Sequence, residues 1–333
     1  MDCIIFSFHN KPHQTIMARY WTTLKDLQQA NMIDNPTDLS GVAEHFQIRI
    51  SPAMQALMDG DATNPIHQQF IPSSKEGIIL EDEVSDPIGD IPYTPVTGIV
   101  HRYQDRALLK VTQLCAVYCR FCFRKEMIGQ YGESLSRDEL EDAFTYIESH
   151  PELWEIILTG GDPLILSVNR LTHILTRLAC VPHLQNIRIH TRIPVVAPEM
   201  ITDELLSLFS EIQAMGKTLT IVIHANHADE LTDTVAATMK RLQQNGIMLI
   251  SQSVMLRGIN DDFETLAALM RRFIAVHIKP YYLHQLDFAR GTSHFRVPEE
   301  KAVALIRELR LKLSGICVPV LIQEIPHGKK PLF

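Results

Sequence analysis

The sequence predicts an α/β protein whose main part is a partial (β/α)6 barrel. Short apolar runs alternate with amphipathic stretches from about residue 96 onward, a pattern typical of a parallel sheet with covering helices. Most repeats span about 30 residues, the size of one strand-helix-strand unit. A polar cluster follows each apolar run, at the strand end where such barrels build their sites.

The composition is that of a globular protein. The 333 residues are 46% hydrophobic and 21% charged, which excludes a disordered chain. No apolar run reaches the roughly 20 residues of a membrane span, and we expect a cytoplasmic protein. The net charge of -8 argues against a nucleic-acid-binding surface. We therefore expect a small-molecule partner, with neither nucleic acid nor membrane involved.

Residues 1–95 are expected to form a helical accessory region that ends in an extended connector. Apolar residues recur at helical spacing between residues 20 and 31, and Asn35 and Pro36 then indicate a stop followed by a new helix cap. Proline and glycine are frequent between residues 86 and 98, and proline disfavours both ladder hydrogen bonds and a helical residue before it. We place a domain boundary in this connector.

Residues 96–315 are expected to form the barrel, and residues 316–333 a C-terminal strand followed by a basic segment. Strands are predicted at 107–111, 155–158, 186–190, 219–223, 248–251 and 278–283, with a seventh candidate at 318–322. Helices are predicted at 136–149, 168–179, 201–215, 229–245, 262–275 and 298–312, several of them beginning at Ser or Asp caps. The polar clusters should converge at one rim, so we expect one large site.

Three of the six cysteines form a compact motif on the loop after the first barrel strand. Cys115, Cys119 and Cys122 read CxxxCxxC, and thiolates are soft ligands suited to zinc or to iron-sulfur clusters. Closed zinc sites and ordinary four-iron clusters use four protein ligands, whereas three cysteines on a cubane leave one iron open to another molecule. A zinc site completed by a distant histidine and a set of buried apolar thiols are the alternatives.

This motif, with Phe121 before its last cysteine, resembles the signature of the radical S-adenosylmethionine (SAM) superfamily. Gly160, Gly161 and Asp162 follow the next strand and look like the superfamily's strand-end motif; glycine permits close backbone approach to a ligand. The resemblance implies a [4Fe-4S] cluster on the three cysteines, with SAM on the open iron. It places the following residues beside SAM: Gly160, Gly161, Asp162, Arg192 and His224. A histidine at a strand end can equally be a core residue.

Further segments resemble the lysine 2,3-aminomutase family, an isomerase family. They are HRYQDR at 101–106, CRFCFR at 119–124, QSVMLRGIND at 252–261 and PYYL at 280–283. The resemblance implies migration of the 2-amino group of L-lysine to carbon 3, through a 5'-deoxyadenosyl radical and pyridoxal phosphate (PLP), giving β-lysine. The short chain, the N-terminal helical part and His284 look closest to the member that makes β-lysine for modification of elongation factor P.

The resemblance also implies how PLP is held. Lys329, in the HGKKPL segment at 327–332, corresponds to the PLP lysine. Lys330 is the alternative, because the segment lacks the family's glycine run and carries a second lysine. Arg102, Arg106 and Gln252 match the phosphate-binding positions, and the planar guanidinium of arginine suits phosphate geometry.

Three residues match the family's substrate-binding positions. Arg124 corresponds to the residue that takes the substrate carboxylate, and Asp287 and Glu324 to the acids that hold the distal ammonium of lysine. Two carboxylates facing one cavity repel each other unless a cation lies between them. A substrate with a positive tail therefore fits this pair.

The implied partners are L-lysine, a reductant such as flavodoxin or ferredoxin, and elongation factor P with its lysyl-transferring ligase. One alternative is a radical SAM enzyme that acts on another amino acid or forms no bond between PLP and a lysine. Another is a non-enzymatic iron-sulfur or zinc module that serves a partner protein.

Overall fold

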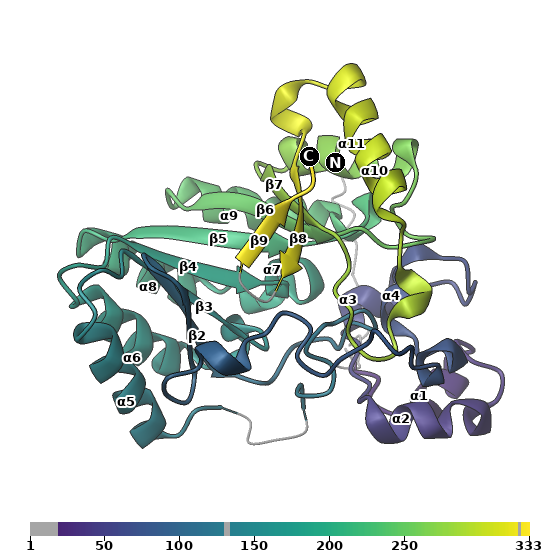
Figure 1. The fold of residues 1–333 in the computed structure, drawn as a ribbon, viewed down its shortest axis with the longest axis horizontal. Coiled ribbons are helices and arrows are strands. Elements are labelled where there is room, and N and C mark those ends of the chain that lie inside the picture. Colours follow the sequence, from purple (N-terminus) through teal and green to yellow (C-terminus); the bar gives the residue numbers. More distant parts are fainter. Residues whose placement is uncertain (1–18, 130–133, 326–327) are drawn as a thin grey trace, which may run out of the picture.

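The computed structural model describes residues 19–129, 134–325 and 328–333, so residues 1–18 of the predicted accessory region and His327 of the basic segment lie outside the described residues. Its centre is a nine-stranded sheet in which the strand order follows the chain from β1 to β9 (Figure 1). The sheet is covered by helices, as the alternating pattern predicts.

Seven consecutive strands are parallel, which confirms the predicted α/β partial barrel. They include the six predicted barrel strands and the seventh candidate: β2 (Arg106–Thr112), β3 (Glu155–Gly160), β4 (Asn186–Thr191), β5 (Thr218–His224), β6 (Met248–Val254), β7 (Lys279–His284) and β8 (Val320–Ile325). β1 (Ile99–Tyr103) and β9 (Gly328–Pro331), which were not predicted as strands, add antiparallel partners at the two edges.

The long helices between these strands are those predicted, with two differences in the helical segments. They are α5 (Arg137–Glu148), α6 (Val168–Ala179), α8 (Asp203–Ala214), α9 (Asp233–Gln244), α10 (Phe263–Ala275) and α11 (Glu299–Lys312). The helix predicted at 229–245 is divided, because Thr232 adopts extended backbone and its hydroxyl accepts the N–H of Val235 as the cap of α9. The residues before it form a separate 3-10 turn (Ala228–Glu230). A short helix after β4, α7 (Ile193–Val196), was not predicted.

The region before the sheet consists of short helices that pack on the barrel. They are α1 (Leu24–Gln29), α2 (Ser40–His45), α3 (Pro52–Gln55) and α4 (Pro65–Phe70). Leu27, Ile50 and Phe70 are buried in the same apolar core as the barrel strands. The division at residue 95 stays a prediction.

Further 3-10 turns are found along the chain. They lie at Pro36–Leu39, Ser74–Gly77, Ile91–Tyr93, Pro163–Ile165, Pro198–Met200, Ser293–Phe295 and Gly315–Cys317.

The two edges of the sheet approach each other. Arg102 on β1 lies 3.6 Å from Glu324 on β8, measured from Nη1 to Oε2. The two ends of the sheet, β1 at one and β8 with β9 at the other, therefore border the same interior space. No helix in the described part of the chain is both long and apolar enough to cross a membrane.

Candidate active site

A cavity of about 260 Å³ lies at the carboxyl ends of the parallel strands. Every site residue that the sequence predicts contributes to its wall: Arg102, Arg106, Cys115, Cys119, Cys122, Arg124, Gly160, Gly161, Asp162, Arg192, His224, Gln252, Asp287, Glu324 and Lys329. These residues come from segments more than 200 positions apart in the chain. The fold therefore brings the cysteine motif, the arginines, the two acids and Lys329 to one space.

The cysteine loop is anchored by the N-terminal region. The N–H of Tyr118 donates to the carbonyl of Arg49 at 2.9 Å, and the N–H of Arg120 donates to the carbonyl of Gln69 at 2.8 Å. The buried Arg120 side chain also pairs with Glu76, 2.6 Å from Nη2 to Oε2, and Lys125 lies 2.8 Å from the same oxygen. Burial alone would raise the pKa of Glu76, but these two cations bring it below its usual value.

The three cysteines of the loop are partly buried and line the cavity. Burial raises the pKa of all three, and that of Cys122 to about 11. A metal or cluster that binds here must therefore displace protons. Among the described residues, no three His, Cys, Asp or Glu side chains gather so as to hold a metal ion. A cubane places its three ligated irons at different corners, so its thiolates need not converge on one point.

The two glycines at the carboxyl end of β3, Gly160 and Gly161, bring that strand end against the cysteine loop. The N–H of Gly161 donates to the carbonyl of Thr112 at 2.6 Å, and the N–H of Asp162 donates to the carbonyl of Leu114 at 2.8 Å. A Cβ on Gly161 would lie 2.2 Å from that Leu114 oxygen, and Gly160 has a φ of +112°. Both positions need glycine for this close packing.

Asp162 is buried, and its carboxylate accepts hydrogen bonds from neighbouring protein groups. It accepts the Thr191 hydroxyl at 2.7 Å and the N–H groups of Arg192 and Ile193 at 2.7 and 3.0 Å. Burial raises the pKa of Asp162, and these hydrogen bonds partly offset the rise. The residue joins the ends of β3 and β4, and its predicted role beside SAM stays a prediction.

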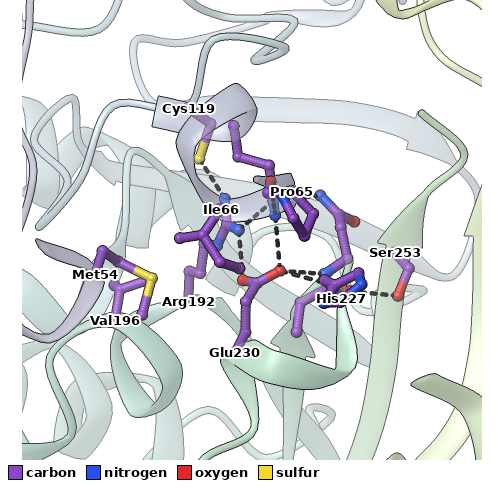
Figure 2. Close-up of polar contacts among 12 residues, drawn as sticks. Met54, Pro65, Ile66, Cys119, Arg192, Val196, His227, Glu230 and Ser253 are labelled. Atoms are coloured by element: carbon purple, nitrogen blue, oxygen red, sulfur yellow. Dashed lines mark hydrogen bonds and ion pairs between the residues drawn. The ribbon is translucent and has the colours of Figure 1, made fainter. Parts of the chain in front are cut away.

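Arg192 links the cysteine motif to two distant segments (Figure 2). Its Nη1 donates to Cys119 Sγ at 2.7 Å, and its Nη2 donates to Gln69 of α4 and to Glu230, both at 2.6 Å. Glu230 also accepts the N–H groups of Asn226 and His227. Burial opposes the charge on Arg192, but its anionic neighbours raise its pKa. The sequence did not identify Gln69 and Glu230 as site residues, because an isolated amide and an acid at a turn belong to no recognisable motif.

Two arginines of the cavity, Arg102 and Arg124, pair with another residue that the sequence did not single out. Asp90 lies 3.1 Å from Arg102 and 3.1 Å from Arg124, and its carboxylate is 3.8 Å from Lys110. Nothing in the sequence distinguishes this aspartate from the other acids of the connector. Arg106 pairs instead with Asp105, at 2.7 Å.

The acid pair lies beside Lys329. Glu324 Oε1 is 3.2 Å from Lys329 Nζ and 3.8 Å from His284 Nδ1. Asp287 lines the same cavity, and its burial, together with the charge of Glu324, raises the pKa of Asp287 to about 7. The two carboxyls thus face a region that favours a cation.

The two adjacent lysines of β9 have different surroundings. Lys329 lines the cavity, with Nζ 4.6 Å from the centre of the Tyr282 ring, and its side chain is 27% exposed. Lys330 is 53% exposed and lies 3.8 Å from Glu299 of α11. Successive residues of a strand point to opposite faces, which explains the difference.

Several buried polar atoms on the cavity wall are unpartnered. Within the described residues, no hydrogen-bond partner reaches Nε2 of His190, His224 or His284. The Tyr103 hydroxyl and Arg102 Nε are also buried and have no hydrogen-bond partner among the described residues. Burial lowers the pKa of the three histidines, to about 3 for His224, so the imidazoles are neutral. Because buried polar groups normally have partners, this wall suits a polar ligand.

The chain is similar to several known proteins. The sequence profile of the Radical SAM superfamily matches residues 109–270. The chain is 37% identical over 291 residues to the L-lysine 2,3-aminomutase of Escherichia coli (strain K12), covering 86% of this chain and 83% of that one. It is 34% identical over 292 residues to the L-lysine 2,3-aminomutase of Clostridium subterminale, covering 86% and 69%. Among solved structures, a radical SAM methyltransferase from Sphaerobacter thermophilus matches with a TM-score of 0.45 and 16% identity, over 68% of each chain.

Proposed function

The chain belongs to the lysine 2,3-aminomutase family of radical SAM enzymes, and from this membership we propose that it converts L-lysine to β-lysine. Members of this family are isomerases, so the chain is a radical SAM aminomutase. One observation supports lysine as the substrate. The cysteine motif, Lys329 and the acids Asp287 and Glu324 all line the same cavity.

The family implies a [4Fe-4S] cluster and SAM, and the residues present fit both. Cys115, Cys119 and Cys122 would hold the cluster, and the backbone of Gly160 and Gly161 lies against the same loop. The proposed PLP also finds suitable groups: Lys329 for its carbonyl carbon, and Arg102, Arg106 and Gln252 for its phosphate. The unpartnered Arg102 Nε and Tyr103 hydroxyl support a polar ligand at this position. When bound, these groups supply a hydrogen-abstracting radical and a conjugated system for nitrogen migration.

The protein's own contribution is to bind and orient the substrate. Arg124 would receive the carboxylate of lysine through charge-assisted hydrogen bonds. Asp287 and Glu324 would receive the distal ammonium, and Glu324 already holds one ammonium, that of Lys329, at 3.2 Å. A substrate without a positive tail would leave the two acids uncompensated, which costs several kcal/mol for a buried charge. Holding both ends of lysine fixes carbons 2 and 3 within the cavity.

The proposal is tested with protein reconstituted anaerobically with iron, sulfide and PLP. Incubation with L-lysine, SAM and a reductant should yield β-lysine, measured by mass spectrometry after chromatography. L-norleucine, which has the same chain length without the ammonium, should yield no β-amino acid. Cleavage of SAM without β-lysine would favour a radical SAM enzyme for another amino acid. Binding of zinc in place of iron and sulfide would favour the non-enzymatic module.

We also propose a role for the product in the modification of elongation factor P, within the cytoplasm. The support is the resemblance of the N-terminal helical part and of His284 to the family member with that role. Addition of elongation factor P and its lysyl-transferring ligase to the completed reaction should increase the mass of the factor by one β-lysyl group. Flavodoxin or ferredoxin should replace the chemical reductant in the same reaction.

A further inference from the structure

The connector before β1 holds Asp90 in a fixed turn at the cavity wall. Asp86 accepts the N–H groups of Asp90 and Ile91, both at 2.9 Å, and the Thr94 hydroxyl donates to the Asp90 carbonyl at 2.9 Å. Such side-chain hydrogen bonds to backbone groups fix a turn in the absence of a regular helix or strand. The carboxylate of Asp90 is therefore presented to the cavity from a defined backbone position.

Each oxygen of this carboxylate bonds a different arginine. Oδ1 accepts from Nη2 of Arg102 at 3.1 Å, and Oδ2 accepts from Nη2 of Arg124 at 3.1 Å. All three side chains are about nine-tenths buried or more, with exposures of 10, 7 and 11% for Asp90, Arg102 and Arg124. Arg102 belongs to β1 and Arg124 to the cysteine loop, so one carboxylate joins two elements that are otherwise separate.

The bridge leaves both arginines able to bind other anions. An arginine has five N–H donors. Nη2 of Arg102 donates to Asp90 and to the Ile88 carbonyl, and Arg124 donates to Asp90 from Nη2 and to the Gly160 carbonyl from Nη1, so each arginine keeps further N–H groups. The Nε of Arg102 has no hydrogen-bond partner among the described residues. In the described part of the chain, the cavity wall carries six cationic side chains and four carboxyls: Arg102, Arg106, Arg124, Arg188, Arg192 and Lys329, against Asp90, Asp162, Asp287 and Glu324. Even with all four carboxyls ionised, two positive charges remain, which suits two incoming anionic groups.

We propose that Asp90 is a positioning residue that fixes the relative orientation of Arg102 and Arg124. This inference rests on the proposed function, in which Arg102 receives the phosphate of PLP and Arg124 the carboxylate of lysine. By bridging them, Asp90 sets the distance between the two anions, and so the placement of the substrate relative to the cofactor. Asp90 acts through the arginines and touches neither reacting atom.

The test is Asp90→Asn in the full chain, with Glu81→Gln as the matched control. Asparagine keeps the shape of aspartate but replaces one acceptor oxygen with an NH2 donor, so one of the two arginines loses its partner. Glu81 is an exposed acid nine residues before Asp90 in the chain. Binding of PLP and of pyridoxal, which lacks the phosphate, is titrated by absorbance with no cluster present.

We expect Asp90→Asn to raise the dissociation constant of PLP about tenfold, the effect of one charge-assisted hydrogen bond, and to leave that of pyridoxal unchanged. In the reconstituted enzyme the KM for lysine should rise by a similar factor with little change in kcat, because Arg124 binds the carboxylate equally in the ground and transition states. Asp90→Glu should recover part of the PLP affinity. Glu81→Gln should match the wild type.

Unchanged or tighter PLP binding in Asp90→Asn would overturn the inference, because Asp90 would then be a bystander or a competitor of the phosphate. Equal weakening of PLP and pyridoxal would also overturn it, since that result indicates a general loss of structure. A wild-type protein that binds no PLP or forms no β-lysine overturns the proposed function together with this inference. A wild-type protein that does both, with an indistinguishable Asp90→Asn variant, overturns the inference alone.

Discussion

Lys329 and Lys330 are neighbours in the chain, yet only Lys329 faces the cavity. We predict that Lys329→Ala abolishes β-lysine formation and the attachment of PLP to the protein, because no other residue of β9 presents an amine to the cavity wall. Lys330→Ala should retain both, since its partner Glu299 lies on an outer helix. The measurement is the mass of the protein after borohydride reduction in the presence of PLP. Loss of attachment in Lys330→Ala alone would reverse the assignment.

Asp287 predicts a pH dependence of substrate affinity. Its pKa of about 7 means that the carboxyl is largely protonated at pH 6 and largely ionised at pH 8. Only the ionised form attracts the ammonium of lysine strongly, so the KM for lysine should fall by about tenfold between these pH values. Asp287→Asn should have a high KM that changes little over the same range. An equally steep pH dependence in this variant would assign the titration to another group.

The same carboxyl affects the stability of the unliganded protein. In the unfolded chain Asp287 ionises near its ordinary pKa of about 3.9, whereas in the folded protein it does so at about 7. The folded state therefore keeps a proton that the unfolded state loses, so the contribution of Asp287 to stability is highest below pH 4 and declines as the pH rises to 7. Asp287→Asn should remove this decline. The gain over wild type, on the order of 4 kcal/mol at most, is checked by urea unfolding at pH 5 and pH 8.

At the scale of elements, the strand end after β3 supports the cysteine loop through Gly161. We predict that Gly161→Ala displaces the loop, because its Cβ would meet the Leu114 oxygen at 2.2 Å and neither group is a flexible side chain. Overpacking of this kind costs about 1–3 kcal/mol. The iron content after reconstitution should fall severalfold while the circular dichroism spectrum is retained.

Gly315→Ala is the matched control for this substitution, because nothing lies within 4 Å of its added Cβ. It should bind iron as the wild type does. If Gly161→Ala also retained full iron content, the packing of the strand end against the loop would not be needed for cluster assembly.

The elements differ in how well the sequence predicts them. β3 to β7 are apolar runs buried by neighbouring strands and helices, and their composition reflects that burial. β1 and β9 are short, carry polar residues such as His101 and Lys330, and pair only at an edge. Their strand conformation results from pairing with β2 and β8, which no local pattern encodes. The division of the helix before α9 likewise depends on a single cap at Thr232.

At the scale of the whole molecule, the residues of the candidate site were predictable because sequence motifs contain them. The residues that hold these side chains in place were not predictable. Arg192 was predicted, but its partners Gln69 and Glu230 lie 123 and 38 positions away in the chain. Asp90 is one acid among several in a proline-rich connector. Such residues become recognisable only when the fold places their charge beside a buried partner.

The curvature of the sheet predicts a consequence of PLP binding for the entire fold. The proposed phosphate ligands Arg102 and Arg106 lie on β1 and β2, and Lys329 lies on β9, so bound PLP would connect the two edges of the open sheet. A ligand that binds only the folded state stabilises it by about 2.7 kcal/mol at a concentration 100 times its Kd. The unfolding temperature should therefore rise by roughly 4 °C.

Hydrogen exchange distinguishes this connection from local binding. PLP should slow exchange both in the β1–β2 hairpin and in β8 and β9, because opening either edge would break a contact to the ligand. Pyridoxal reaches Lys329 but offers no phosphate to the arginines, so it should slow exchange in β8 and β9 and leave β1 unchanged. Protection at a single edge with PLP would show that the ligand does not span the opening of the sheet, and the phosphate assignment of Arg102 and Arg106 would then be wrong.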